Sequence, residues 1–153
     1  MLKINCRMCN EKRLRIILDL GFTPLADSFL NENQLNEPEK YYPLRLCFCE
    51  NCGLFQLDYV VDKDELYRKN YPYLSSITST GRNHFHTMAS DICKNFKFGE
   101  NCFAVDIGSN IGVLLEGFKN QGLTVLGVDP ATNIAQMAND HGIETIPDYF
   151  NSA

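Results

Sequence analysis

Two cysteine pairs, Cys6-x-x-Cys9 and Cys49-x-x-Cys52, constrain this chain more than any other feature of its sequence. Two thiolates on a tight turn can hold one edge of a tetrahedral metal site, and a second pair completes the site. A metal with four protein ligands has no open position, so such a site is structural. The spacing therefore predicts a zinc ion that stabilises a small N-terminal unit.

Three further cysteines, Cys47, Cys93 and Cys102, make the total seven. Cys47 lies two residues before Cys49, so strand alternation would place both on one face and make Cys47 a competing ligand. Reduced, buried cysteines without a metal are the alternative to a zinc site. Redox chemistry is disfavoured, because neither pair opens a helix after a buried strand.

The residues around the cysteine pairs have the pattern of a small β-rich unit. Apolar runs broken by Gly, Pro and a tight turn at 50–53 predict three strands, at residues 14–20, 43–48 and 54–61. We assign residues 1–61 to a zinc-binding domain. Residues 62–98 follow as a helical linker, with a tyrosine-rich stretch and a helix from about residue 81 to residue 98.

The last third of the chain alternates between strand and helix patterns. Buried strands are predicted at 103–108 and 123–129, helices at 110–122 and 131–142, and the start of a third strand at 143–147. This order implies a parallel sheet with right-handed crossovers. The predicted fold class is α/β, with an incomplete Rossmann-like sheet over residues 99–153.

The segment Asp106-Ile-Gly-Ser-Asn-Ile-Gly112 joins the first of these strands to its helix. Open α/β sheets bind ligands at this crevice. The spacing is not GxGxxG, because Asn110 and Val113 stand where glycines would be needed, so a pyrophosphate cradle is disfavoured. Asp129 ends the next strand, where an acid can accept hydrogen bonds from ribose hydroxyls. The pattern favours a nucleoside ligand such as S-adenosylmethionine (SAM) over an ordinary turn with solvated acids.

Taken together, these segments resemble the SAM-dependent sugar C-methyltransferases of deoxysugar biosynthesis. The resemblance covers nearly the whole chain, in order, through the stretches CRMC, DLGFTPLADSFL, YYPLRLCFCENCGLFQLDYVV, YPYLSS, FAVDIGSNIGVLLEGFK, VLGVDPATNIAQMAN and GIETIPDYF. It implies a zinc-binding domain, a SAM-binding domain and a C-terminal substrate domain. It also implies methylation of a carbon next to the keto group of a nucleotide-linked deoxysugar.

The resemblance assigns roles to individual residues. Zinc would be held by Cys6, Cys9, Cys49 and Cys52, and the SAM pocket would be lined by Asp106, Gly108, Ser109, Asn110, Gly112 and Asp129. Ile111 departs from the family pattern, which usually has Asp there. The YPYLSS segment would cover the active site, with Tyr71 as the first catalytic candidate, His84 as the second, and Tyr73, Ser75 and Ser76 near the substrate. A tyrosine-rich packing linker and a surface histidine are the alternatives; His86 and His141 are expected to be structural.

Charge and hydropathy exclude other classes. A net charge of −5 and the lack of a Lys/Arg cluster argue against a zinc-ribbon nucleic-acid binder. No apolar run is long enough for a transmembrane helix, and the polar N-terminus does not resemble a signal peptide, so we expect a cytoplasmic protein.

Two strand–helix units are only part of a SAM-binding sheet, which leaves an edge strand and an apolar face uncovered. The late catalytic residues and the substrate domain of the family have no counterpart here. We therefore expect the chain alone to be inactive, as a truncated product or a piece of a split protein, with self-association or a partner chain completing the sheet. A zinc-dependent protein-interaction module with a vestigial nucleotide fold is the alternative function.

Overall fold

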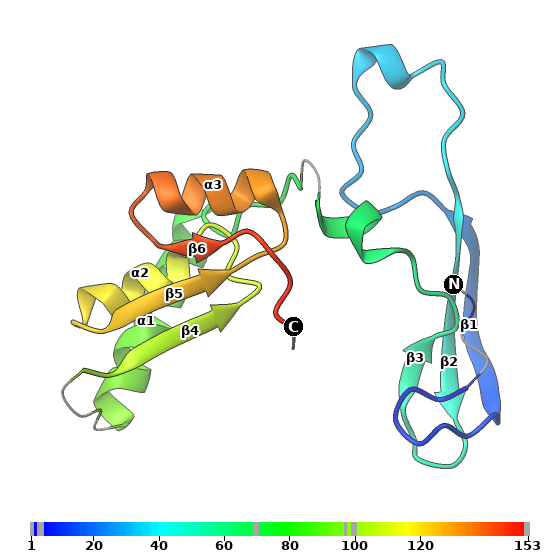
Figure 1. Ribbon diagram of the computed structural model, residues 1–153. Helices are drawn as coiled ribbons and strands as arrows, with labels where there is room; N and C mark the ends of the chain where they lie inside the picture. Colours follow the sequence, from blue (N-terminus) through cyan, green and yellow to red (C-terminus); the bar gives the residue numbers. More distant parts are fainter. Residues whose placement is uncertain (1, 3–4, 69–70, 97, 99–100, 152–153) are drawn as a thin grey trace. The chain divides into compact units, whose positions relative to one another are not determined.

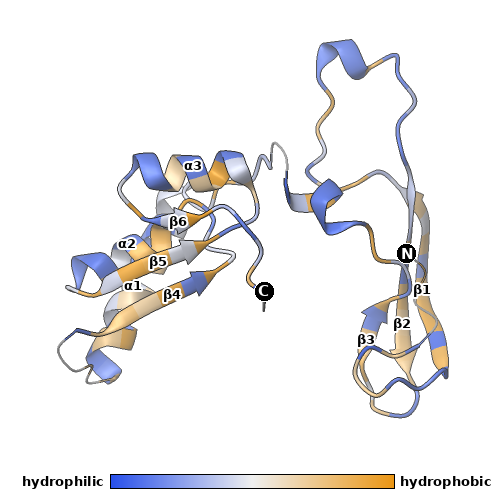
Figure 2. Cartoon of the chain, in the orientation of Figure 1, coloured by the Kyte–Doolittle hydropathy of each residue, from blue (hydrophilic) through white to orange (hydrophobic). Residues whose placement is uncertain are grey.

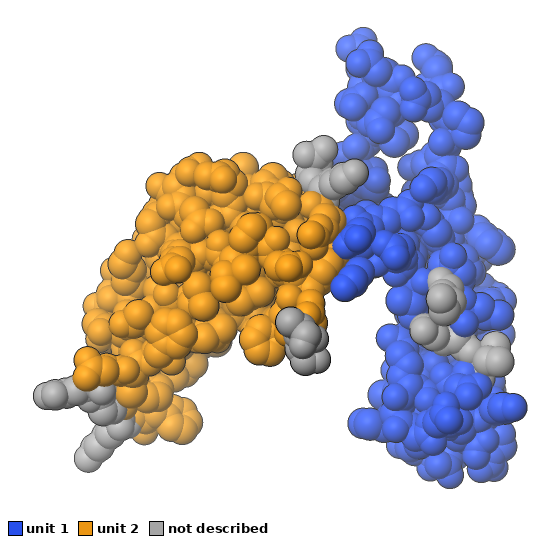
Figure 3. Space-filling model, in the orientation of Figure 1, with its two compact units in different colours: residues 1–66 blue, residues 67–153 orange. Residues whose placement is uncertain are grey.

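The computed structural model describes residues 2, 5–68, 71–96, 98 and 101–151. The chain divides into two compact units, residues 1–66 and 67–153 (Figures 1 and 3). Helix α1 (Ser79–Asn95), which the sequence analysis assigned to a separate linker, packs against α2 (Val113–Asn120) within the second unit. Among the helices that the structure describes, none has the length and apolar character that crossing a membrane requires.

The first unit is an antiparallel sheet of three strands in the order β1–β2–β3. These are β1 (Leu14–Thr23), β2 (Tyr42–Cys49) and β3 (Phe55–Leu57), with short helical turns at Glu32–Gln34 and Asp64–Arg68. β1 extends past its predicted end because a register shift between Asp19 and Phe22 accommodates Gly21 at a φ of 74°. β3 is shorter than predicted, since Tyr59 leaves the ladder to form an isolated bridge with Leu2.

The apolar core of the first unit is very small. Its buried apolar residues, among those described, are Cys6, Cys47 and Cys49. β1 leaves most of its apolar side chains in solvent, with Leu20 56% and Phe22 69% exposed. A sheet with so little buried apolar surface needs another source of stability.

The second unit is a parallel sheet in the order β4–β5–β6, crossed by helices as the sequence predicted. The strands are β4 (Phe103–Ile107), β5 (Thr124–Val128) and β6 (Thr145–Ile146), and α3 (Thr132–Asp140) joins the last two. Leu115, Val125, Ala138 and Ile143 form the core between the sheet and the helices. α1 begins two residues earlier than predicted, because Thr78 caps it by accepting a hydrogen bond from the Gly81 N–H at 3.0 Å.

One face of this sheet is apolar and exposed. Phe103, Val105 and Ile107 alternate along β4 with exposures of 55%, 46% and 59%, and Figure 2 shows most of the strand in hydrophobic colours. Within the described residues, β4 pairs with β5 alone, so the other edge of β4 forms no backbone hydrogen bonds with a neighbouring strand. An open edge and an uncovered face are what the sequence predicted for an incomplete sheet.

Candidate functional site

The four cysteines of the two pairs come together at one end of the first unit. The sulfur atoms of Cys6, Cys9, Cys49 and Cys52 all lie within 4.8 Å of one another. The two distances across the pairs are 3.5 Å, for Cys6 to Cys52, and 3.6 Å, for Cys9 to Cys49. Sulfurs bonded tetrahedrally to Zn²⁺ lie about 3.8 Å apart, given a Zn–S bond near 2.3 Å. The four thiols therefore fit a zinc ion with no open coordination position.

The two turns that carry these thiols have the same backbone design. The Asn10 N–H donates to the Cys6 carbonyl at 2.9 Å, and the Gly53 N–H donates to the Cys49 carbonyl at the same distance. Asn10 and Gly53 both take a positive φ, of 58° and 77°, which Asn and Gly tolerate best. Each C-x-x-C is therefore followed directly by a left-handed residue, which closes the turn that brings its two sulfurs together.

Neighbouring groups in the turns favour the thiolate, the form that binds metal, at Cys6 and Cys9. A hydrogen bond from the Cys9 backbone is the main cause that lowers the pKa of Cys6. The side chain of Asn51, followed by the Glu11 backbone, lowers the pKa of Cys9 to about 6. At Cys52 a backbone hydrogen bond from Leu54 lowers the pKa, but it is outweighed by desolvation and by the hydrogen bonds to the other three thiols, which raise the pKa to about 12. Cys47 lies buried in β2 outside the four-thiol group, so it is not the competing ligand that its position suggested.

A cavity of about 660 Å³ opens at the carboxyl ends of β4 and β5 in the second unit. This volume is in the range of small-molecule and cofactor sites. Of the predicted cofactor residues, Asp106, Gly108, Ser109, Asn110 and Asp129 line it. Gly112 does not line it; it is buried at the start of α2, where its φ of 79° turns the chain into the helix. Ile111 is also absent from the wall.

Two backbone hydrogen bonds hold Asp129 in the wall of the cavity. Its side chain is buried, and its two carboxylate oxygens accept hydrogen bonds from the Asn110 N–H at 2.8 Å and the Ala131 N–H at 2.9 Å. A carboxylate can accept about four hydrogen bonds, so capacity for a ligand remains. The turn that follows β4 and the turn between β5 and α3 thus both donate a backbone hydrogen bond to the same carboxylate in the cavity wall.

The tyrosine-rich segment forms another part of the wall. Of the residues predicted near the reacting groups, Tyr71, Tyr73 and Ser75 line the cavity and Ser76 does not. His84, the second catalytic candidate, lies exposed on α1 beside a separate, smaller hollow. The structure gives His84 no place in the cavity wall.

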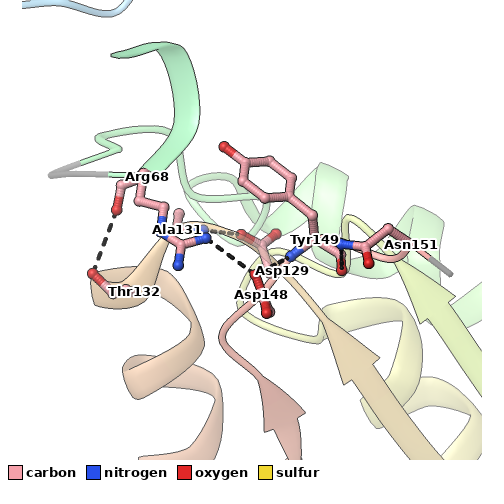
Figure 4. A network of polar contacts seen from close by, with 7 residues as sticks. All are labelled: Arg68, Asp129, Ala131, Thr132, Asp148, Tyr149 and Asn151. Atoms are coloured by element: carbon pink, nitrogen blue, oxygen red, sulfur yellow. Dashed lines mark hydrogen bonds and ion pairs between the residues drawn. The ribbon is translucent and has the colours of Figure 1, made fainter. Parts of the chain in front are cut away.

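Sequence reasoning missed one side of the cavity, formed by the segment after β6. Asp148, Tyr149 and Phe150 line it. Arg68 donates to Asp148 at 3.1 Å, lies over the Tyr149 ring at 5.6 Å, and accepts at its carbonyl from Thr132 (Figure 4). The sequence carried a signal for Asp148: it comes shortly after β6, as Asp129 comes directly after β5 and Asp106 lies one residue before the end of β4.

Burial gives Asp106 a testable pH dependence. Burial, and then the Asp129 carboxylate, raise the pKa of Asp106 above its usual value. When a carboxyl has a higher pKa in the folded state than in the unfolded state, the folded protein loses stability as the pH rises through the folded-state pKa. Asp106→Asn should therefore raise the melting temperature at pH 7, and by less near pH 4. Glu144→Gln, at an exposed position, controls for net charge; an equal gain at both pH values for Asp106→Asn would contradict this account.

Comparison with known proteins finds two similarities to this chain. Residues 6–67 match the family model Methyltransf_13, described as "Putative zinc binding domain". The chain is also 33% identical over 147 residues to C-methyltransferase NovU of Streptomyces niveus. That alignment covers 96% of this chain and 35% of the relative, so the chain spans about a third of the length of the protein it matches.

Proposed function

We propose that the chain belongs to the C-methyltransferase family that carries this zinc-binding domain, and that its second unit binds SAM for methyl transfer to carbon. The observation that supports this most directly is Asp129, a buried acid at the end of β5 in the wall of a 660 Å³ cavity. An acid at that position of an α/β sheet can accept hydrogen bonds from both ribose hydroxyls. The zinc domain has a structural role in this proposal.

The charge and composition of the wall suit the rest of the cofactor. Asp106 and Asp129 place two carboxylates near a ligand whose sulfonium and amino groups are cationic. Tyr71, Tyr149 and Phe150 offer aromatic faces for the adenine ring or the sulfonium. When bound, SAM supplies an electrophilic methyl group. Tyr71 is our candidate for the residue next to that group.

For the complete protein, we propose a nucleotide-linked keto-deoxysugar as substrate and a cytoplasmic location. The reaction needs a base for the proton next to the ketone and donors that stabilise the enolate. Tyr73 and Ser75 line the cavity where such a substrate would approach, and Ser76 neighbours them in the chain. We assign the remaining chemistry to residues outside this chain. Methyl transfer from labelled SAM to a nucleotide-linked ketosugar by the 153-residue chain would contradict that assignment.

Titration of the purified chain with SAM in a calorimeter tests the cofactor site. Asp129→Asn should weaken SAM binding by about tenfold or more, because a charge-assisted hydrogen bond to ribose is lost. Asp140→Asn removes the same charge from an exposed position of α3 and should leave the affinity unchanged. A melting curve of each variant separates weaker binding from unfolding. If the wild-type chain shows no heat with SAM, the alternative of a zinc-dependent interaction module gains support.

A further inference from the structure

Two asparagine side chains hold the segment that walls the cavity. We call residues 71–76, which form neither helix nor strand, the tyrosine strap. Asn133, in the first turn of α3, accepts from the Tyr71 N–H at 3.2 Å and donates to the Tyr71 carbonyl at 2.9 Å. Asn110 accepts from the Ser75 N–H and donates to the Tyr73 carbonyl, both at 2.9 Å. Each amide thus satisfies a backbone donor and a backbone acceptor, as a neighbouring strand would.

We propose that Asn110 and Asn133 are positioning residues, a pair of amide clamps that hold the tyrosine strap in place and thereby set the affinity for SAM. This rests on the proposed function. Asn133 is only partly exposed and does not line the cavity, so its side chain can influence a ligand only through the strap. Asn110 was predicted as a cofactor ligand from sequence, but its side-chain amide is engaged by Tyr73 and Ser75.

Asn110 also connects the strap to the acid that we assign to ribose. Its backbone N–H donates to Asp129 at 2.8 Å while its side chain holds the strap. Its φ of 51° is left-handed, a conformation that asparagine adopts more readily than most residues. Asn110 therefore helps to hold both the Asp129 carboxylate and the tyrosine strap in place. If the strap opens more often, the affinity falls in proportion to the closed fraction.

Amide hydrogen exchange of the whole chain, measured by NMR, tests the clamps without a ligand. Asn133→Ala keeps α3, because alanine is the better helix former. The Tyr71 amide should then exchange about tenfold faster, since its hydrogen-bond acceptor is lost. Gln136→Ala is the matched control on the same helix, because its side chain bonds Asp140 and not the strap. Equal Tyr71 exchange in the two variants would overturn the proposal.

Asn133→Asp provides a conservative rescue. Its carboxylate can still accept from the Tyr71 N–H but cannot donate to the Tyr71 carbonyl. Protection of the Tyr71 amide should therefore return, although the hydrogen bond from residue 133 to the Tyr71 carbonyl stays lost. At the other clamp, Asn110→Gly tolerates the left-handed φ and should speed exchange of the Ser75 amide.

SAM titration of the same variants connects the clamps to binding. Asn133→Ala should weaken SAM binding by about three- to tenfold at an unchanged melting temperature, and Asn133→Asp should fall between it and wild type. Faster exchange in Asn133→Ala with a wild-type affinity would overturn the link between strap and ligand. No SAM binding by the wild-type chain would overturn the proposed function, and exchange alone would then decide whether the clamps exist.

Discussion

Removal of zinc is expected to unfold the first unit while the second unit stays folded. The buried apolar residues described in the first unit are three cysteines, two of them metal ligands. Structural zinc contributes on the order of 10–16 kcal/mol of apparent binding free energy, which matches or exceeds the stability of a typical domain, about 5–15 kcal/mol. The second unit keeps its own core of Leu115, Val125, Ala138 and Ile143. Amide exchange after treatment with a chelator should therefore show loss of protection in β1–β3 alone.

Two serine substitutions in β2 distinguish the effect of losing the metal from the effect of losing a buried thiol. Cys49→Ser removes a ligand and should reduce the zinc content, measured by mass spectrometry, well below the one ion per chain expected of wild type. Cys47→Ser changes a thiol that is equally buried but lies outside the four-thiol group, and should retain the ion. A first unit that keeps its exchange protection without zinc would contradict the structural role of the site.

The second large effect is expected at Gly112, where α2 begins. A Cβ at this position would lie 2.6 Å from Ile143 Cγ2, inside the core, and the φ of 79° is left-handed. Gly112→Ala should lower the free energy of unfolding of the second unit by about 2–4 kcal/mol, the sum of the left-handed penalty and overpacking. Urea unfolding followed by amide signals of β4 and β5 measures this change.

Gly122 provides the matched control for that substitution. It also has a positive φ, of 90°, but a Cβ there would meet nothing within 4 Å. Gly122→Ala should therefore cost about 1 kcal/mol, from backbone strain alone. Equal losses in the free energy of unfolding for Gly112→Ala and Gly122→Ala would mean that the contact with Ile143 does not contribute to the loss.

The features that the sequence predicted well are those with a local cause. The C-x-x-C pairs, the strand–helix alternation and the acids Asp106 and Asp129 each depend on residues close together in the chain. The grouping of the four thiols followed from their chemistry, because few arrangements of two cysteine pairs serve any other purpose. The exposed face of β4 followed from the small number of strands.

The features that it missed depend on contacts between distant residues. Asn133 lies 62 positions from Tyr71, and Arg68 lies 80 positions from Asp148. Nothing local distinguishes these side chains from solvated ones, since asparagine and arginine are common on surfaces. Cys47 shows the same limit: alternation predicted a shared face with Cys49, but the position of its thiol outside the metal group depends on how both turns fold.

The separation of the two cysteine pairs has a consequence for the order of events in folding. The 39 residues between Cys9 and Cys49 form a long loop, and closing such a loop costs on the order of 3 kcal/mol of chain entropy. The antiparallel ladder of β1 and β2 brings Leu14 opposite Cys49 and so closes it. We therefore expect the hairpin to form before tight metal capture, so that zinc uptake is limited by slow, non-local strand pairing and not by diffusion of the ion.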